Sequence, residues 1–269
     1  MQNINLAKIL FIGCGKMGSI LLNNLLQNGA QISQTKIIDP AFAGADFAGV
    51  ATYSNAADLP SDFIADFVFI CTKPQNSHEI LTNFLQAKKI DKNSIIISIL
   101  AGKKIKFLST IFGSKVKIVR AMPNIAIQEK QGVVAYYLSK NIKNEEILTI
   151  KEIFKNFGEI IELQDEKKFD IFTAIFGSGP AYIFLLQEIF VQIAKENGFD
   201  ENVAKLIHKL FLGSSLMSQN GEFVKLRESV TSKEGTTDAA LQILQKNNAL
   251  QKLFSKAIKS AVKRSKKLQ

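Results

Sequence analysis

The sequence predicts an α/β chain, in which a mostly parallel sheet covered by helices is followed by an all-helical part. Three observations support this prediction. A glycine-spaced segment at residues 13–18 (GCGKMG) joins an apolar run to a helical pattern. Strand-like and helix-like segments then alternate as far as Leu163, which is typical of a parallel sheet with helices on both faces. From Asp165 onward the strand pattern disappears and helical periodicity continues.

The glycine-spaced segment has the pattern that binds the pyrophosphate of a dinucleotide. In that pattern Gly13 permits a tight turn, Gly15 lets the backbone approach the phosphates, and Gly18 lets the helix pack closely on the strand. The helix start offers free N–H groups and the positive end of a dipole to the anion. The alternative is a glycine turn that merely joins a strand to a helix.

The residues after this segment favour nucleotide binding over that alternative. Apolar residues recur at helical spacing from Met17 to Leu26, and residues 28–29 (NG) form a typical helix end. A second strand ends on Asp39, about 20 residues past the last glycine. A carboxylate at that position can accept a hydrogen bond from the ribose 2′-hydroxyl.

The other elements are predicted in order from periodicity and turn residues. Strands are expected at residues 8–12, 35–38, 48–53, 66–71, 94–100, 116–120, 132–138 and 159–163. Helices are expected at residues 76–87, 104–112, 144–156, 181–197, 201–219 and 239–269, with Gly198 ending one helix and Asp200 capping the next. A boundary near Leu163 divides the chain into domains 1–163 and 164–269. The helices after it are so apolar that a second subunit is the simplest means of burying them.

Composition limits the classes of function. The chain of 269 residues is 46% hydrophobic, which suits a globular protein with a sizeable core. Residues 1–7 lack a signal-peptide pattern, and the longest apolar stretch, residues 181–194, is interrupted by polar side chains and too short to span a bilayer. Cys14 and Cys71 have no metal-like spacing. We therefore expect a cytoplasmic protein with free thiols, no bound metal and no membrane contact.

The formal net charge of +10 is spread along the chain rather than gathered into one binding surface. The dense basic run at residues 263–267 suits the end of a helix. No basic strand carries interleaved aromatic residues of the kind that stack on bases, so we expect no nucleic-acid partner. His78 and His208 lie in helical patterns, and no Ser-His-Asp or metal constellation can be assembled around them.

Four polar loops stand at the ends of predicted strands or helices. Residues 71–74 (CTKP) and 120–124 (RAMPN) each follow a buried strand, at the sheet edge where ligands of parallel sheets bind. Residues 176–182 (FGSGPAY) begin a helix, with Ser178 available as its cap, which is also an ordinary way to begin a helix. Residues 230–238 (VTSKEGTTD) place four hydroxyls and a glycine before a helix, and such donors can bind a carboxylate.

Together these segments resemble the pyrroline-5-carboxylate reductase family. The matching pieces occur in the family's order across nearly the whole chain, at residues 11–18, 73–74, 122–124, 177–182, 230–232 and 235–237. The resemblance implies a Rossmann-type domain that binds NADPH or NADH, followed by a helical dimerisation and substrate-binding domain. It implies hydride transfer to the C=N bond of a cyclic imine, 1-pyrroline-5-carboxylate, which yields L-proline in the last step of proline biosynthesis. It also implies a homodimer, and often a ring of dimers.

The resemblance implies the site residues as well. It places cofactor contacts at Gly13, Gly15, Lys16, Met17 and Gly18, with Asn55, Lys73, Pro74 and Ala101 nearby. It places substrate contacts at Ser232, Gly235, Thr236 and Thr237. Thr237 matches the threonine whose hydroxyl meets the ring nitrogen, and it is the expected catalytic residue. An imine can arrive already protonated, so positioning and a carboxylate clamp are the main requirements and no strong general acid is needed.

Three positions depart from the family pattern. Residues 233–234 (KE) stand where the family usually has Pro-Gly, and residues 223–224 (FV) where it commonly has His-Pro. Both changes bear on substrate binding. Asp39 follows the second strand, where members that favour NADPH tend to carry small polar or basic residues. Because Asp39 would repel a 2′-phosphate and no arginine lies within residues 39–53, we expect NADH to be at least as good a donor as NADPH.

Two alternatives remain open. A catalytically silent nucleotide-sensing paralogue would make residues 233–234 the mark of a lost substrate site. A 3-hydroxyacid dehydrogenase shares the domain order, but it needs a lysine on the helix after its glycine-rich segment to act on a hydroxyl proton. The helix after residues 177–179 offers no lysine before Lys195, so this interpretation ranks lowest.

Overall fold

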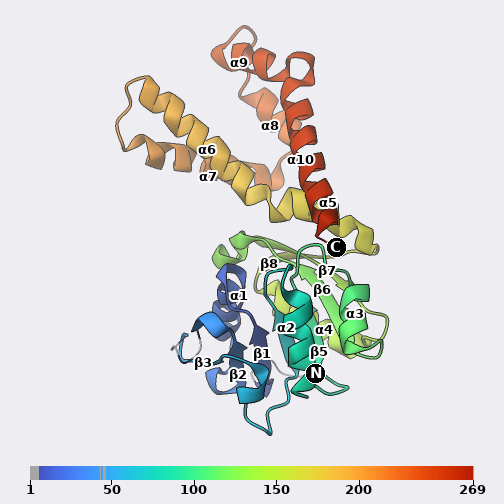
Figure 1. Cartoon of the computed structure of the whole chain (residues 1–269). Coiled ribbons are helices and arrows are strands. Elements are labelled where there is room, and N and C mark those ends of the chain that lie inside the picture. Colours follow the sequence, from blue (N-terminus) through green and yellow to red (C-terminus); the bar gives the residue numbers. More distant parts are fainter. Residues whose placement is uncertain (1–5, 43, 45–46, 269) are drawn as a thin grey trace. The chain divides into compact units, whose positions relative to one another are not determined.

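The chain folds into two compact units. The computed structural model describes residues 6–42, 44 and 47–268 (Figure 1). One unit comprises Met1–Gly177 together with Val262–Gln269, and the other comprises Ser178–Ala261. The division by packing thus falls after the boundary near Leu163. As a division between two functions, the boundary at Leu163 stays a prediction.

The first unit is built on a mostly parallel sheet. Within the described residues the sheet has eight strands in the order β3-β2-β1-β4-β5-β6-β7-β8. The strands are β1 (Ile9–Ile12), β2 (Thr35–Ile38), β3 (Ala51–Tyr53), β4 (Phe67–Ile70), β5 (Ile95–Ser98), β6 (Lys117–Met122), β7 (Gly132–Leu138) and β8 (Gly158–Glu162). Strands β1 to β6 are parallel, β7 is antiparallel to β6, and β8 is parallel to β7. The predicted α/β class is confirmed.

Helices cover both faces of this sheet. They are α1 (Lys16–Gln27), α2 (Ser77–Gln86), α3 (Ile105–Phe112) and α4 (Asn144–Lys155). Helices α1 and α4 share one apolar cluster with the sheet, and α2 and α3 share the other. Because alternate side chains of a strand point to opposite faces, β1 sends Phe11 to the first cluster and Leu10 to the second. The core therefore holds β1, the strand that leads into the glycine-rich loop, from both sides.

The second unit consists of helices joined by short loops, with no strand among its described residues. Its helices are α6 (Gly179–Glu196), α7 (Val203–Met217), α8 (Phe223–Ser229), α9 (Thr236–Gln245) and most of α10 (Ala249–Lys267). The last residues of α10 belong to the first unit. The sequence-based expectation of an all-helical part after the sheet is confirmed.

Several predicted boundaries were wrong. Strand β3 begins at Ala51 rather than residue 48, because a turn bridged by Phe47 and Val50 precedes it. The predicted helix over residues 239–269 is two helices, α9 and α10, because Asn247 between them has φ +53. Helix α8 was not predicted. Asp200 accepts a hydrogen bond from the backbone N of Asn202, but Asn202 itself is the cap of α7.

The segment before α6 is helical, which the sequence did not predict. The short helix α5 (Phe169–Phe172) continues through a π-helical turn, Thr173–Gly177, into α6, and the side chain of Ser178 makes no capping hydrogen bond. The resulting run, Glu166–Glu196, is long and apolar enough to cross a membrane by length and composition. The apolar stretch at residues 181–194 is thus part of a longer helical run than the sequence predicted. Within this chain 22% of that run's most apolar window is buried.

Candidate functional site

The glycine-rich loop lies between the end of β1 and the start of α1. Gly13 has φ +83, and a Cβ there would lie 2.9 Å from Cγ2 of Thr72. A Cβ on Gly18 would lie 2.8 Å from the carbonyl oxygen of Gly13. Nothing lies within 4 Å of the corresponding position on Gly15, which caps α1 without a side-chain hydrogen bond. The loop is therefore tightly packed at Gly13 and Gly18 and open at Gly15. At this open helix start an anion could approach the N–H groups.

Asp39 joins the end of β2 to this loop. Its Oδ2 accepts a hydrogen bond from the backbone N of Cys14 at 2.8 Å, and its Oδ1 accepts one from the backbone N of Ala41 at 3.0 Å. A carboxylate offers about four acceptor positions, so two remain for a ligand. Asp39 thus holds the glycine-rich loop in place and can still accept hydrogen bonds from a ribose.

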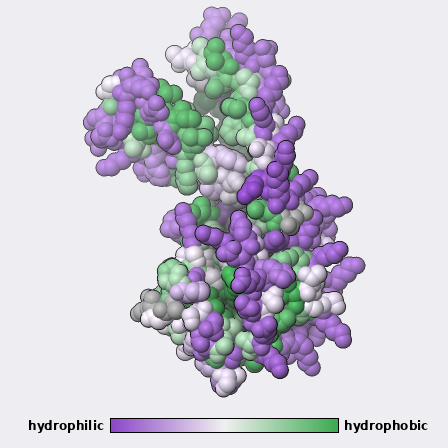
Figure 2. Space-filling view, in the orientation of Figure 1, coloured by the Kyte–Doolittle hydropathy of each residue, from purple (hydrophilic) through white to green (hydrophobic). Residues whose placement is uncertain are grey.

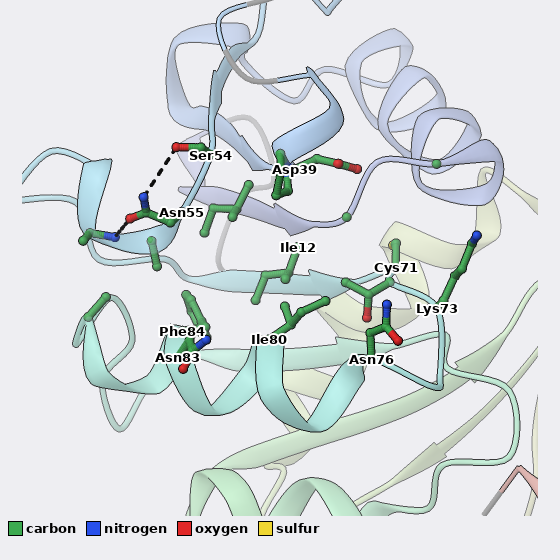
Figure 3. Close-up of a pocket in the computed structure, with 18 of the residues that line it drawn as sticks. Ile12, Asp39, Ser54, Asn55, Cys71, Lys73, Asn76, Ile80, Asn83 and Phe84 are labelled. Atoms are coloured by element: carbon green, nitrogen blue, oxygen red, sulfur yellow. Dashed lines mark hydrogen bonds between the residues drawn. The ribbon is translucent and has the colours of Figure 1, made fainter.

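A cavity of about 660 Å³ opens beside the loop. Figure 3 shows its lining from β1, β2, the short turn Ala56–Asp58, the segment after β4 and α2. Five predicted cofactor residues line it: Gly13, Gly15, Asp39, Asn55 and Lys73. The other five lie outside this lining: Lys16, Met17, Gly18, Pro74 and Ala101. The structure therefore brings half of the predicted cofactor set together around one cavity.

The cavity also contains residues that sequence reasoning missed. Thr72 is the second residue after β4, and its Oγ1 is buried without a hydrogen-bond partner among the described residues. Ile80, Asn83 and Phe84 line the cavity from α2 (Figure 3). Thr72 was within reach of prediction, because it belongs to the polar loop after a buried strand. The α2 residues have ordinary helical spacing and give no signal without the fold.

Few charged side chains line this cavity. Among its described lining residues they are Asp39 and Lys73, and none is an arginine. Lys36 lies outside the lining, and its Nζ donates a hydrogen bond to the backbone O of Ser33 at 3.1 Å. Asn55 is held by its own turn, with Oδ1 accepting from the backbone N of Ala57 at 2.8 Å. Asp39 therefore faces no arginine in the lining that could offset its charge.

Cys14 belongs to the glycine-rich loop, Cys71 lies beside it, and both are neutral thiols. Burial, and then the charge of Asp39, raise the pKa of Cys14 to about 12. Burial and then Cys14 raise the pKa of Cys71 well above its usual value. A thiol is nucleophilic only as the thiolate, so neither cysteine is suited to covalent catalysis. No group of three or more potential metal ligands occurs in the part of the chain that the structure describes.

The predicted substrate residues are in the second unit, at the start of α9. Gly235 caps the helix, and Thr236 and Thr237 form its first turn. A Cβ on residue 235 would lie 2.4 Å from Oγ of Ser232 and 3.0 Å from its backbone O, so a larger residue would require Ser232 to shift. Glu234 has φ +61, a left-handed conformation that favours glycine, and its backbone N donates to Oδ2 of Asp238 at 3.1 Å. The structure thus groups these residues in one loop of the second unit.

The second unit exposes many large apolar side chains. Figure 2 shows apolar surface over its helices. In α6 and α7 the exposed fractions include 59% for Phe184 and 60% for Leu206. Val203 is the one buried apolar residue among the described residues of 178–261. A surface of this kind marks an interaction site.

Comparisons with known proteins agree with these features. Residues 166–268 match the family described as pyrroline-5-carboxylate reductase dimerisation. Residues 8–102 match the family described as NADP oxidoreductase coenzyme F420-dependent. The match over residues 8–102 contains the glycine-rich loop, and the match over residues 166–268 contains the exposed helices α6 and α7.

Individual relatives cover almost the whole chain. Pyrroline-5-carboxylate reductase of Pseudomonas aeruginosa is 30% identical over 97% of this chain and 96% of its own. The enzyme of the same name from Staphylococcus aureus is 31% identical over 96% of each chain. Among solved structures, Plasmodium falciparum pyrroline carboxylate reductase with NADP bound has a TM-score of 0.87 and 26% identity, covering 99% of both chains. The Coxiella burnetii pyrroline-5-carboxylate reductase has a TM-score of 0.85 and 28% identity, also covering 99% of both.

Proposed function

Because the chain belongs to the pyrroline-5-carboxylate reductase family, we propose that it reduces 1-pyrroline-5-carboxylate to L-proline. The reaction is NAD(P)H-dependent and is the last step of proline biosynthesis. The observation that carries this conclusion is the match of relatives over nearly the full chain. Steady-state turnover of 1-pyrroline-5-carboxylate with NADH and with NADPH tests it. Absence of turnover would instead favour the catalytically silent nucleotide-sensing paralogue.

The first unit fits a nicotinamide dinucleotide. The uncapped start of α1 and the open side of Gly15 suit a pyrophosphate, and the buried Oγ1 of Thr72 lacks a partner that a ligand could supply. The remaining acceptor positions of Asp39 suit the ribose hydroxyls. When bound, the dinucleotide supplies the hydride. We assign the same task of holding it to Lys16, Met17 and Gly18 of the first turn, and to Asn55, Lys73, Pro74 and Ala101.

Asp39 bears on the choice of cofactor. A 2′-phosphate beside its carboxylate would bring like charges together, and no arginine occurs in the described lining to offset them. NADH is therefore proposed to be at least as good a donor as NADPH. The solved Plasmodium relative, by contrast, has NADP bound.

The start of α9 is proposed to hold the substrate. Residue 235 leaves the helix start free of any side-chain cap, so its N–H groups are available to the carboxylate of the substrate. Ser232 and Thr236 add hydroxyl donors. The hydroxyl of Thr237 is proposed to meet the ring nitrogen and orient the imine. With the imine already protonated, these residues have only to position it and balance its charges.

The protein is an oligomer that acts on a small molecule. We propose a homodimer in which a second copy covers the apolar side chains of α6 and α7, and further a ring of such dimers. The match of residues 166–268 to a dimerisation family supports a protein partner rather than lipid for the apolar run Glu166–Glu196. We propose a cytoplasmic location without membrane or nucleic-acid partners. Light scattering of the purified protein measures the subunit number.

A further inference from the structure

The loop after β5 belongs to the predicted cofactor site. This β5 loop, residues 99–104, includes Ala101, which the family resemblance places near the dinucleotide. Strands β4 and β5 are parallel neighbours, and the backbone N of Ile99 donates a hydrogen bond to the backbone O of Ile70 at 3.1 Å. The β5 loop therefore starts beside residues 71–73, which line the cavity.

The middle of the β5 loop meets the end of α10. Gly102 is buried and has φ +79. A Cβ there would lie 2.6 Å from Cβ of Leu268, 2.9 Å from its backbone C and 3.0 Å from the backbone O of Ser265. Two of these three atoms are backbone atoms, so a side chain at residue 102 would force the end of α10 to shift. The last described turn of the chain thus lies directly against the β5 loop.

Ser265 fixes this last turn within the first unit. It is buried, and its Oγ donates a hydrogen bond to Oδ1 of the buried Asp170 at 2.7 Å. The backbone N of Leu268 donates to the backbone O of Ser265 at 3.1 Å, which closes the turn. Residues 262–269 belong to the first unit, as do Asp170 and Gly102, so all of these contacts lie within one compact unit.

The two ends of the β5 loop have supports of their own. Ala101 packs against the buried apolar cluster that includes Phe169. Beyond the loop, the backbone N of Ile105 donates a hydrogen bond to Oε1 of Glu166 at 2.8 Å, and the same oxygen accepts one from Nη1 of the buried Arg120 at 3.0 Å. The end of α10 therefore supplies the middle of three supports for the β5 loop.

We propose that Ser265 and Leu268 are positioning residues for the cofactor. They act through Gly102, by holding the β5 loop in the conformation in which Ala101 meets the dinucleotide. A loop that is ordered before binding loses less conformational entropy when the ligand arrives, and the ordering of one residue corresponds to about a tenfold factor in affinity. This inference rests on the cofactor part of the proposed function.

The test is the dissociation constant for NADH in the full-length protein carrying Ser265→Ala or Leu268→Gly, measured by titration of nicotinamide fluorescence. It is expected to rise about tenfold in each variant, because the loosened loop must be ordered by the ligand. The Michaelis constant for NADH should rise by a similar factor, while the catalytic rate at saturating NADH should stay within about twofold. A misfolded fraction would lower the number of binding sites and leave the dissociation constant unchanged.

Ser94→Ala is the matched control. Ser94 is also buried and its Oγ donates a hydrogen bond, to the backbone O of Ala65 at 2.6 Å. It lies just before β5, whereas the β5 loop follows the same strand at its other end. The dissociation constant of this variant for NADH should equal that of the wild type.

A double-mutant cycle tests the contact itself. Gly102→Ala should raise the dissociation constant for NADH, because the new Cβ displaces the end of α10 from the β5 loop. Adding Ser265→Ala to Gly102→Ala should then cause little further change, since the support is already lost. If the two factors instead multiply, Ser265 and Gly102 act independently and the proposal is overturned.

The outcomes separate this inference from the proposed function. Unchanged dissociation constants in Ser265→Ala and Leu268→Gly, in a protein whose wild type reduces 1-pyrroline-5-carboxylate, overturn the inference and leave the function intact. An equal rise in Ser94→Ala also overturns it, because any buried hydroxyl would then have the same effect. A wild type that binds NADH without reducing 1-pyrroline-5-carboxylate overturns the function, and the binding measurements still decide the role of Ser265 and Leu268.

Discussion

The two units of this chain differ in how far they bury their apolar side chains. In the first, every residue of β1, β4 and β5 is buried, and helices cover both faces of the sheet. In the second, α6 has no buried residue although its sequence is among the most apolar of the chain. Apolar composition therefore does not say whether a segment completes its own core. The first unit buries its apolar side chains within the chain, whereas the second leaves most of its own exposed.

The largest expected effect comes from placing a charge on the exposed apolar surface. Ile183→Asp in α6 should prevent dimer formation at micromolar concentration and lower activity by at least about a hundredfold, because an unpaired buried carboxylate costs several kcal/mol. Light scattering and steady-state kinetics measure both. Leu148→Asp is the control, since Leu148 in α4 is 47% exposed and Ile183 is 46% exposed. Equal losses of dimer formation and activity in the two variants would show that the exposed apolar surface of the second unit is no more important than that of the first.

The next effect concerns the substrate loop of the second unit. Thr237→Ala should lower the catalytic rate roughly tenfold to a hundredfold while NADH affinity stays the same, since one hydrogen bond to a charged group is worth about 1.5–3 kcal/mol. Kinetics and direct cofactor titration measure the two parts separately. Unchanged kinetics would remove Thr237 from the site.

A smaller effect is expected in the first unit, at Asp39. Asp39→Ser should lower the ratio of catalytic efficiencies for NADH over NADPH by about tenfold, through loss of the ribose acceptor and of repulsion toward a 2′-phosphate. Both cofactors should also bind more weakly, because the backbone N of Cys14 loses its partner. Asp62→Ser, at an exposed carboxylate, is the control. A wild-type ratio strongly in favour of NADPH would mean that Asp39 does not contact the ribose.

Residues 233–234 should matter less than their departure from the family pattern suggests. Exchanging them for Pro-Gly should change the Michaelis constant by less than about tenfold, or roughly 1.4 kcal/mol, because Gly235 keeps the tightest position of the loop. It should raise the free energy of unfolding by about 1 kcal/mol, since glycine adopts the positive φ of Glu234 without strain. Thermal unfolding measures this. A dormant parent enzyme revived by the exchange would favour the silent paralogue.

The smallest effect is expected for the alkylation of the two cysteines, which should hardly occur in the native protein. The raised pKa values of Cys14 and Cys71 keep both groups as thiols well above neutral pH, so alkylation of the native protein at pH 7 should be slow. The thiols should stay protected in Ile183→Asp if the first unit folds without the dimer. Mass spectrometry after brief iodoacetamide treatment measures the labelling. Rapid labelling of that variant would show that the core of the first unit depends on the second.

Sequence patterns predicted the first unit well because its strands are short, buried and bounded by turns. The glycine-rich loop and Asp39 were predictable because each has a local backbone requirement and a fixed spacing. The α2 side chains of the cavity could not be ranked, since nothing in their own spacing separates a lining residue from a core residue. Some buried polar groups have partners that are distant in sequence: Arg120 donates to Glu166, and Ser265 donates to Asp170.

The second unit was predicted in kind but less well in detail. Helical periodicity indicated α6 and α7, yet α8 is short and the break at Asn247 depends on a left-handed conformation that asparagine adopts without a strong sequence signal. The π-helical turn was missed because residues 176–182 also form an ordinary helix start. Glu234 was noted as a departure from the pattern, but its positive φ became visible only in the fold.

The order of the chain also sets when the first unit can be completed during synthesis. The first unit includes residues on both sides of the second, so Ser265 emerges from the ribosome only after all of residues 178–261. Until then Asp170 lacks its hydroxyl partner and residues 101–102 lack the segment that lies against them. Synthesis of the first unit therefore begins before that of residues 178–261 and ends after it. A truncation within residues 262–268 would therefore damage the unit that was translated first.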